Sequence, residues 1–157
     1  MIEPEAVELL ESPCAMIVGT VDADGLPDAT RGWSLEVVGP SEIRVLLSSN
    51  ATTTLENLAS TGAFALTGTH FMTFVSYQLK GRALRTEPAT AEDRIRFDAF
   101  CAGCVTAIHE GDGTPEELVW RLLPPGLVAC IVAVDSVFDQ TPGPAAGAKL
   151  APTETRA

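Results

Sequence analysis

The residues best suited to chemistry form one polar stretch between an apolar run and a helix start. Residues 43–47 are apolar apart from one arginine, and several hydroxyl side chains follow at close spacing: Ser48, Ser49, Thr52, Thr53 and Thr54. Thr53 stands three residues before Glu56, which predicts a capping box and a helix beginning at Thr53. The free N–H groups and positive dipole end of a first helical turn attract anions, so the stretch predicts a phosphate cradle.

The same stretch also has a plainer interpretation. Serine and threonine are favoured at many strand-to-helix turns, because their hydroxyls satisfy backbone groups that the helix leaves unpaired. The residue types alone leave the phosphate cradle and the ordinary turn both open.

Composition and charge restrict the possible partners. The 157 residues are 46% hydrophobic and 20% charged, which is typical of one globular domain with a sizeable core. The formal net charge is −11, whereas nucleic acids and anionic membranes bind clustered Lys and Arg. No apolar run approaches the roughly 20 residues of a membrane span, and the acidic N-terminal segment lacks a basic leader pattern. We therefore expect a cytoplasmic protein that binds neither nucleic acid nor membrane.

Four cysteines are present, and in a reducing compartment we expect them to be free thiols. Cys101 and Cys104 have the spacing of half a zinc or redox motif, but no second cysteine pair accompanies them. They also fall inside a helical pattern. The sequence thus favours packing roles for these thiols over a metal or redox site.

Hydrophobic periodicity predicts a mainly β (α+β) fold. Runs rich in β-branched residues predict six strands, over residues 15–21, 29–38, 43–47, 63–67, 74–85 and 127–138. Helical periodicity predicts four helices, over residues 5–11, from Thr53, over 90–110 and from Thr114 or Pro115. Short strands at regular spacing favour a six-stranded antiparallel barrel with flanking helices.

Several details follow from individual residues. Asp24-Gly25 predicts a hairpin turn, and Gly81 inside a strand predicts a bulge. In the helix over 90–110 we expect one broad apolar face, formed by Ile95, Phe97, Phe100, Val105 and Ile108. Residues 1–145 then form one domain, and the Pro-, Gly- and Ala-rich residues 146–157 an extended or disordered tail.

Five segments, in this order and spacing, resemble the pyridoxamine 5'-phosphate oxidase-like family with the FMN-binding split barrel. The segments are residues 21–27, Arg31-Gly32-Trp33, residues 48–58, residues 78–83 and the closing residues 137–144. The resemblance implies a split β-barrel and a homodimer that holds FMN in a groove between its subunits.

The resemblance also implies which residues hold the cofactor. The second strand would pass the isoalloxazine ring with Thr30, Arg31, Gly32 and Trp33. The third strand and the helix start would grip the phosphate and ribityl chain with Leu47, Ser48, Ser49, Thr52, Thr53 and Thr54. The fifth strand, of the same or the partner subunit, would contribute Ser76, Gln78 and Lys80.

The sequence departs from the pyridoxamine oxidases themselves. Those enzymes have basic residues where this chain has Leu35, Thr53 and Thr54. Charge-assisted hydrogen bonds are about twice as strong as neutral ones. A phosphate bound here would therefore need a cationic side chain from another position, for which Arg31 and Lys80 are candidates. A plain surface cation is the alternative for Arg31. The closing segment also lacks the Arg and His pair that binds pyridoxine phosphate, so we do not expect that activity.

The leading functional hypothesis is an FMN-dependent oxidoreductase acting on a small organic substrate. A flavin carries the redox chemistry itself, so the protein needs no acid or base of its own. The alternatives are a non-catalytic flavin- or haem-binding module and a deazaflavin (F420)-dependent reductase. The residues name no catalytic side chain, substrate or electron donor.

Overall fold

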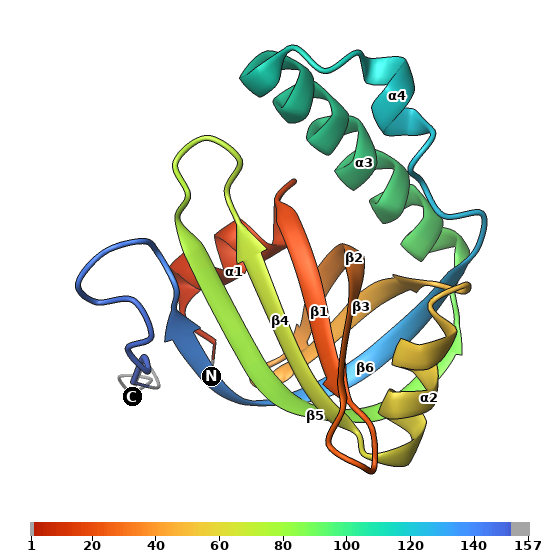
Figure 1. Cartoon of the computed structure of the whole chain (residues 1–157), viewed down its shortest axis with the longest axis vertical. Helices are drawn as coiled ribbons and strands as arrows, with labels where there is room; N and C mark the ends of the chain where they lie inside the picture. The colour runs from red at the N-terminus through yellow and green to blue at the C-terminus, as the bar shows by residue number, and fades with distance from the viewer. Residues whose placement is uncertain (1, 152–157) are drawn as a thin grey trace.

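Six antiparallel strands close into a barrel in the order β1-β2-β3-β6-β5-β4 (Figure 1). The computed structural model describes residues 2–151. The strands are β1 (Ala15–Val21), β2 (Pro27–Gly39), β3 (Glu42–Ser48), β4 (Ala63–Thr69), β5 (Ser76–Pro88) and β6 (Leu127–Asp139). The helices are α1 (Pro4–Glu11), α2 (Thr52–Ser60), α3 (Ala91–Asp112) and α4 (Glu116–Trp120). The predicted six-stranded barrel with flanking helices is confirmed.

The turn between β1 and β2 is the predicted hairpin. The carboxylate of Asp22 accepts the backbone N–H of Asp24 at 2.9 Å and that of Leu26 at 2.8 Å. Gly25 lies in the left-handed region, with φ of 86°, which glycine adopts without steric cost. Together these features reverse the chain within one tight turn and set the register of β1 against β2.

The predicted bulge at Gly81 is present where β5 pairs with β6. The register between the two strands shifts between Lys80 and Gly81. A Cβ at Gly81 would lie 2.0 Å from the carbonyl oxygen of Ala133. Only glycine lets the backbones approach this closely, so this residue fixes the bend of β5.

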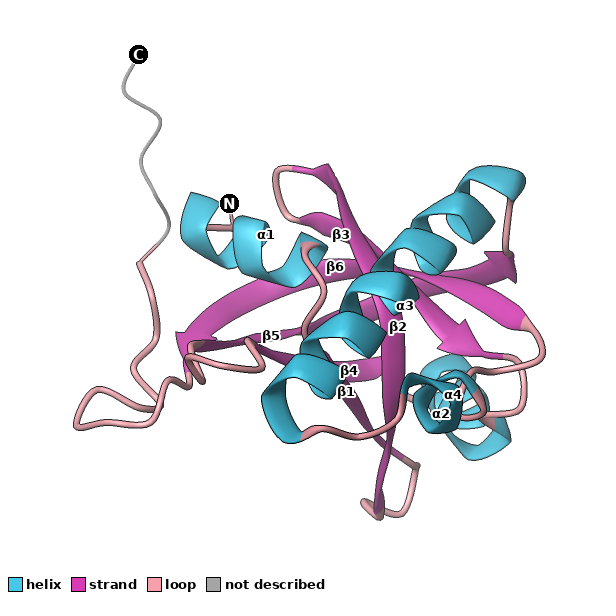
Figure 2. Ribbon diagram, turned by 90° about the horizontal axis from the view of Figure 1, so that it is seen from above, coloured by secondary structure: helices cyan, strands magenta, loops and turns pink. Residues whose placement is uncertain are grey.

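The barrel interior is filled by alternate side chains of the strands, and the helices close its openings. Val18, Val45, Leu66 and Leu79 are among the buried core residues. Helix α1 covers one end, where Leu10 packs so closely on β4 that a Cβ at Gly68 would clash with it. Helix α2 lies at the opposite end, and α3 crosses over β2 (Figure 2).

Two expectations about the helices are wrong. Helix α2 begins at Thr52, its N-cap is Ala51, and no side chain caps it, so the capping box predicted for Thr53 and Glu56 does not form. In α3 the side chain of Ile95 is 70% exposed, whereas Phe97 and Phe100 are buried as expected. No helix within residues 2–151 combines the length and the apolar character needed to cross a bilayer.

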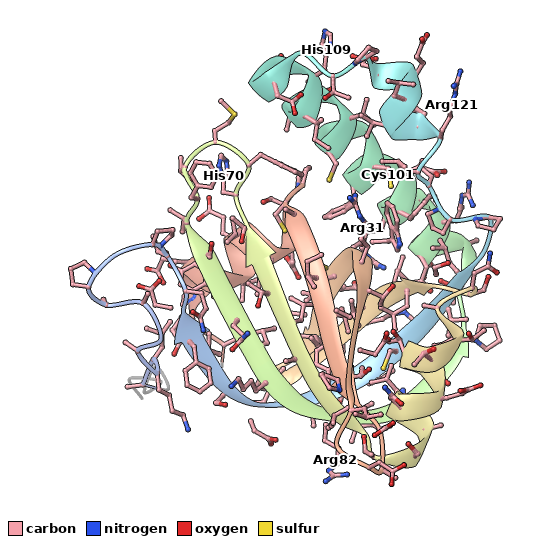
Figure 3. All side chains as sticks on the ribbon, in the orientation of Figure 1. Arg31, His70, Arg82, Cys101, His109 and Arg121 are labelled. Atoms are coloured by element: carbon pink, nitrogen blue, oxygen red, sulfur yellow. The ribbon has the colours of Figure 1, made fainter. Side chains whose placement is uncertain are left out.

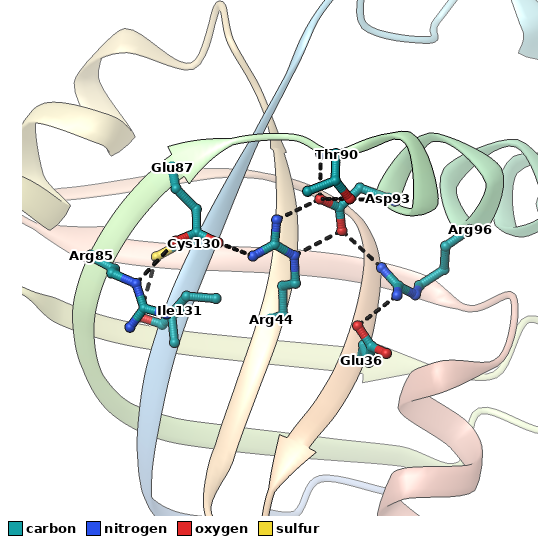
Figure 4. A network of polar contacts seen from close by, with 9 residues as sticks. All are labelled: Glu36, Arg44, Arg85, Glu87, Thr90, Asp93, Arg96, Cys130 and Ile131. Atoms are coloured by element: carbon teal, nitrogen blue, oxygen red, sulfur yellow. Dashed lines mark hydrogen bonds and ion pairs between the residues drawn. The ribbon is translucent and has the colours of Figure 1, made fainter.

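A buried ion-pair network attaches α3 to the barrel (Figure 4). Asp93, whose side chain is 1% exposed, accepts hydrogen bonds from Arg44 Nε of β3 at 2.8 Å and from Arg96 at 2.9 Å. The same carboxylate closes a capping box with Thr90, the N-cap of α3. Arg44 also pairs with Glu87. The network therefore fixes where α3 leaves β5 and how it lies against the sheet.

The last described segment turns back along β6. The N–H of Asp139 donates to the carbonyl of Ala148, and the N–H of Leu150 donates to that of Val137, both at 2.9 Å. The first residues of the predicted tail are thus paired with the barrel, while residues 152–157 lie outside the described part. The domain boundary at residue 145 stays a prediction.

Candidate functional site

The predicted phosphate cradle lies in an open, shallow pocket at the N-terminus of α2, here called the α2 corner. The pocket has a volume of about 140 Å³. Its lining comes from the start of β2 and the start of α2: Asp28, Ala29, Thr30, Asn50, Ala51, Thr52, Thr53 and Thr54. Four of the predicted site residues, all threonines, are therefore brought together here.

The α2 corner offers donors to an anion. The first helical N–H with a backbone partner is that of Leu55, which donates to Ala51. Within residues 2–151, no partner accepts from the backbone N–H groups of Thr52, Thr53 or Thr54. The hydroxyl-bearing side chains of Thr52 and Thr53 are exposed. Free N–H groups at the positive end of a helix can hold a phosphate, so these residues fit the anionic end of FMN.

One feature of the α2 corner opposes an anion. The hydroxyl of Thr54, which is 1% exposed, donates a hydrogen bond to Asp28 Oδ2 at 2.6 Å. The corner thus contains a carboxylate and no cationic side chain. The compensation expected from Arg31 or Lys80 does not occur within one chain, because neither residue lines this pocket.

The neighbouring predicted residues are engaged elsewhere. Leu47 is fully buried in the core, so its side chain is not available to a ligand. Ser48 Oγ accepts the backbone N–H of Asn50 at 3.1 Å. The N–H of Ser49 donates to the carbonyl of Gly126 at 3.0 Å, which joins this turn to the start of β6.

The outer face of β2, β1, β4 and β5 brings together predicted residues from distant parts of the chain. Strand pairing aligns two rows across this face: Arg31, Ile17, Thr67 and Gln78 in one, and Ala29, Gly19, Ala65 and Lys80 in the other. Each row spans three interstrand spacings, roughly 14 Å. The second row is made almost entirely of small residues, so it offers a flat floor on which a planar ring could lie.

The β5 residues of the prediction are partly held in place by neighbours. Gln78 Nε2 donates to the hydroxyl of Thr67 at 3.0 Å. The Lys80 ammonium lies 5.0 Å from the ring centroid of Phe138. Ser76 is buried and donates to the carbonyl of Phe74 at 2.8 Å. Gln78 and Lys80 therefore belong to the outer face, and Ser76 supports the adjoining loop.

A second pocket, here called the helix cavity, lies between α3, α4 and the ends of β1 and β2. Its volume is about 190 Å³. Figure 3 shows Arg31 and Cys101 on opposite sides of this region. The lining is apolar apart from one charged side chain: Cys14, Ala15, Met16, Ile17, Arg31, Gly32, Trp33, Phe71, Phe100, Cys101, Cys104, Val105, Ile108, Val119, Leu122 and Leu123. Three predicted residues, Arg31, Gly32 and Trp33, thus lie here and not in the α2 corner.

The three cysteines of the helix cavity are poor nucleophiles. Burial raises the pKa of Cys14 to about 12, that of Cys101 to about 11 and that of Cys104 to about 12. Thiols with such pKa values stay protonated at neutral pH, and the thiolate is the reactive form. Within the described part of the chain, no three His, Cys, Asp or Glu side chains gather as metal ligands. The cysteines therefore contribute apolar walls.

Sequence reasoning missed two components of these sites. Asp28 follows a hairpin turn and a proline, and no local signal indicates that its carboxylate faces α2. The helix cavity was missed because its walls come from β1 and β2 on one side and from α3 and α4, which follow much later in the chain, on the other. The apolar face predicted for residues 90–110 was the available signal, but such a face does not distinguish a helix packed tightly on the barrel from one with a space beneath it.

Comparison with known proteins supports the fold and identifies the family. The structure resembles HupZ of Group A Streptococcus (TM-score 0.58, 20% identity, covering 94% of this chain and 100% of that one). It resembles an F420 reductase (TM-score 0.57, 15% identity, 87% and 98% covered). It also resembles an FMN-binding protein from Syntrophomonas wolfei subsp. wolfei (TM-score 0.54, 11% identity, 85% of each covered).

At these identities the likeness establishes the shared barrel and nothing finer. Among curated proteins, no sequence matches this one. The family model described as pyridoxamine 5'-phosphate oxidase matches residues 2–124 of the 157. The match covers all of the barrel except β6, together with the α2 corner and all residues that line the helix cavity. The chain therefore belongs to the pyridoxamine 5'-phosphate oxidase-like family.

Proposed function

We propose that this protein is an FMN-dependent oxidoreductase acting on a small organic substrate. The observation that carries the proposal is the α2 corner, an open pocket in which three backbone N–H groups at a helix start have no partner within residues 2–151. Family membership and the likeness to an FMN-binding protein support it. FMN would supply the electron chemistry, and the protein would hold the phosphate with Thr52 and Thr53 and orient the ring along β2.

We further propose a homodimer that buries the outer face of β2, β1, β4 and β5. Ile17 on this face is 48% exposed, and Ala15 and Ala29 beside it are also exposed. The small residues Gly19, Ala29 and Ala65 in the middle of this face would let it pack closely against its own copy in a two-fold dimer. Such a dimer would enclose a planar ring between the two sheets and so exclude water from it.

The test of the cofactor is an FMN titration followed by flavin fluorescence. Thr53→Asp places a carboxylate in the α2 corner while keeping a residue that suits a helix start. We expect FMN affinity to fall at least about tenfold, because a like charge opposes the phosphate. Thr106→Asp on the exposed side of α3 adds the same charge far from the corner and should leave the affinity unchanged. Equal FMN binding by the two variants, or no binding by the wild type, would refute the proposal.

The dimer is tested separately by light scattering. Ala65→Glu introduces a charge in the middle of the outer face, and we expect it to yield monomers. Leu26→Glu changes an exposed side chain at the β1–β2 turn and should leave the oligomeric state as it is. A wild type that remains monomeric at high concentration contradicts this part of the proposal.

A deazaflavin-dependent reductase is the second candidate, because one specific observation favours it. The carboxylate of Asp28 opposes a doubly charged phosphomonoester more than a singly charged phosphodiester. The likeness to an F420 reductase is consistent with this alternative. Parallel titrations with FMN and F420 separate the two, since tighter binding of F420 would displace FMN as the proposed cofactor.

A further inference from the structure

We propose that the helix cavity binds a small apolar carboxylic acid, with one aromatic or aliphatic ring in the cavity and its carboxylate on Arg31. Assigning this ligand as the substrate of the flavin rests on the proposed function, whereas the binding itself does not. The cavity volume of about 190 Å³ exceeds that of a cavity known to hold benzene, about 150 Å³. It therefore has room for one ring and a small substituent.

The walls of the helix cavity determine the apolar part of the ligand. Phe100 and Val105 of α3, Val119 of α4 and Trp33 of β2 face the space with hydrocarbon surface. The thiols that line it stay protonated because burial raises their pKa values, so they add no charge. A strongly hydrated ligand, such as a sugar or a phosphate ester, would lose hydrogen bonds to water on entering and would find few replacements.

Arg31 determines the charge of the ligand. It is the single charged side chain in the lining, and it is exposed at the mouth of the cavity. Within residues 2–151 it has no hydrogen-bond or ion-pair partner, whereas Arg44, Arg94 and Arg96 are each paired with a carboxylate. A guanidinium left unpaired in a chain of net charge −11, at the edge of an apolar space, is suited to a planar carboxylate.

The position of the helix cavity relates it to the proposed flavin site. Arg31 belongs both to the cavity lining and to the row of residues that crosses the outer face with Ile17 and Thr67. A ligand whose carboxylate binds Arg31 would therefore lie next to the row of small residues on which the flavin ring is proposed to lie. The cavity and the floor are contiguous through Ile17 and Arg31, which fits a substrate next to a cofactor.

The experiment titrates the flavin-free full-length protein with benzoate and with benzamide, its uncharged counterpart, by calorimetry. We expect saturable binding of benzoate at least about tenfold tighter than that of benzamide, as one charge-assisted contact provides. Arg31→Gln should remove this preference, whereas Arg121→Gln, which removes an equal charge at the end of α4, should retain it. Equal affinities of the wild type for the two probes, or no saturable binding, would overturn the proposal.

Steric variants and a direct probe locate the ligand. Ile108→Trp should fill the helix cavity and weaken both probes at least about tenfold, while Ile95→Trp on the exposed side of α3 should change neither. The protein has two tryptophans, and only Trp33 lines the cavity. In NMR spectra of the wild type, benzoate should therefore shift the indole N–H signal of Trp33 and not that of Trp120. A shift of Trp120 alone, or benzoate binding unaffected by Ile108→Trp, would contradict the location.

These measurements separate the two proposals. The probes are titrated without flavin, and FMN is titrated without probe. Benzoate binding with no FMN binding would overturn the proposed cofactor and leave the helix cavity assigned. FMN binding with no benzoate binding would overturn the inference and leave the cofactor proposal standing.

Discussion

Thr54 donates its hydroxyl hydrogen bond to Asp28 Oδ2 at 2.6 Å, and both side chains line the pocket at the start of α2. The contact joins the first turn of α2 to the start of β2 across 26 positions of sequence. A carboxylate at the positive end of a helix is itself favourable, so Asp28 stabilises α2. Its carboxylate also places a negative charge in the pocket in which a phosphate would bind.

This contact predicts that Asp28 limits the affinity for FMN. Asp28→Asn removes the charge but keeps an oxygen that can accept from Thr54, so the fold should be retained. We expect FMN to bind five- to tenfold more tightly, corresponding to about 1 kcal/mol of relieved repulsion, and riboflavin, which lacks the phosphate, to bind as before. Fluorescence titrations of the variant and of Asp24→Asn, a control in the nearby turn, measure both ligands. An unchanged or weaker affinity for FMN would show that the phosphate does not approach Asp28.

The buried carboxylate of Asp93 predicts a loss of stability in acid. Hydrogen bonds from the Arg44 guanidinium and from Thr90 hold the pKa of Asp93 well below its usual range. The stabilisation is therefore complete above the unfolded pKa of about 3.9 and is lost as the pH falls below it. Urea unfolding from pH 7 down to pH 2 should show a steeper decline for the wild type than for Asp93→Asn.

At pH 7 the same substitution tests the strength of the network. Asp93→Asn leaves Arg44 without its most buried counter-charge, and we expect it to lower the free energy of unfolding by about 3 kcal/mol. Asp98→Asn breaks only the exposed pair with Arg94 and should cost less than about 0.5 kcal/mol. Equal losses in the two variants would mean that the network contributes no more than a surface pair.

The cysteines are predicted to be protected in the folded protein. Burial raises the pKa of Cys130 to about 11, and the three cysteines of the helix cavity have similarly raised values. At pH 7.5 a thiol with a pKa of 11 is ionised to about one part in three thousand, so a thiolate-selective reagent should react slowly with the native chain. In denaturant, where the thiols are exposed to solvent, all four cysteines should react rapidly. Rapid labelling of one native cysteine, located by mass spectrometry, would contradict this.

The bulge in β5 predicts that substitution of Gly81 destabilises the protein. Gly81→Ala would place a Cβ 2.0 Å from the carbonyl oxygen of Ala133, so one backbone must move. We expect the free energy of unfolding to fall by about 2 kcal/mol or more. Gly39→Ala at the end of β2 has its nearest neighbour at 3.4 Å and should change stability by less than about 0.5 kcal/mol. Comparable melting temperatures for the two variants would rule out the close approach as the reason for glycine.

The sequence by itself determined the features that depend on near neighbours. The strands β1 and β4, the turn at Gly25 and the bulge at Gly81 were all predicted, because strand composition and glycine placement act within a few residues. The helix start after Asn50 was predicted within one residue. The predicted cap was wrong, because the helix begins at Thr52 and Thr53 therefore lies inside the first turn.

The tertiary structure alone decided what surrounds each candidate residue. Asp28 meets Thr54, and Arg44 meets Asp93, because closing the barrel brings together segments 26 and 49 positions apart. Arg31, one candidate for supporting the phosphate, lines the helix cavity and not the α2 corner, because α3 and α4 pass over the ends of β1 and β2. Charge and cavity shape depend on distances in space, and the local pattern of residues does not contain them.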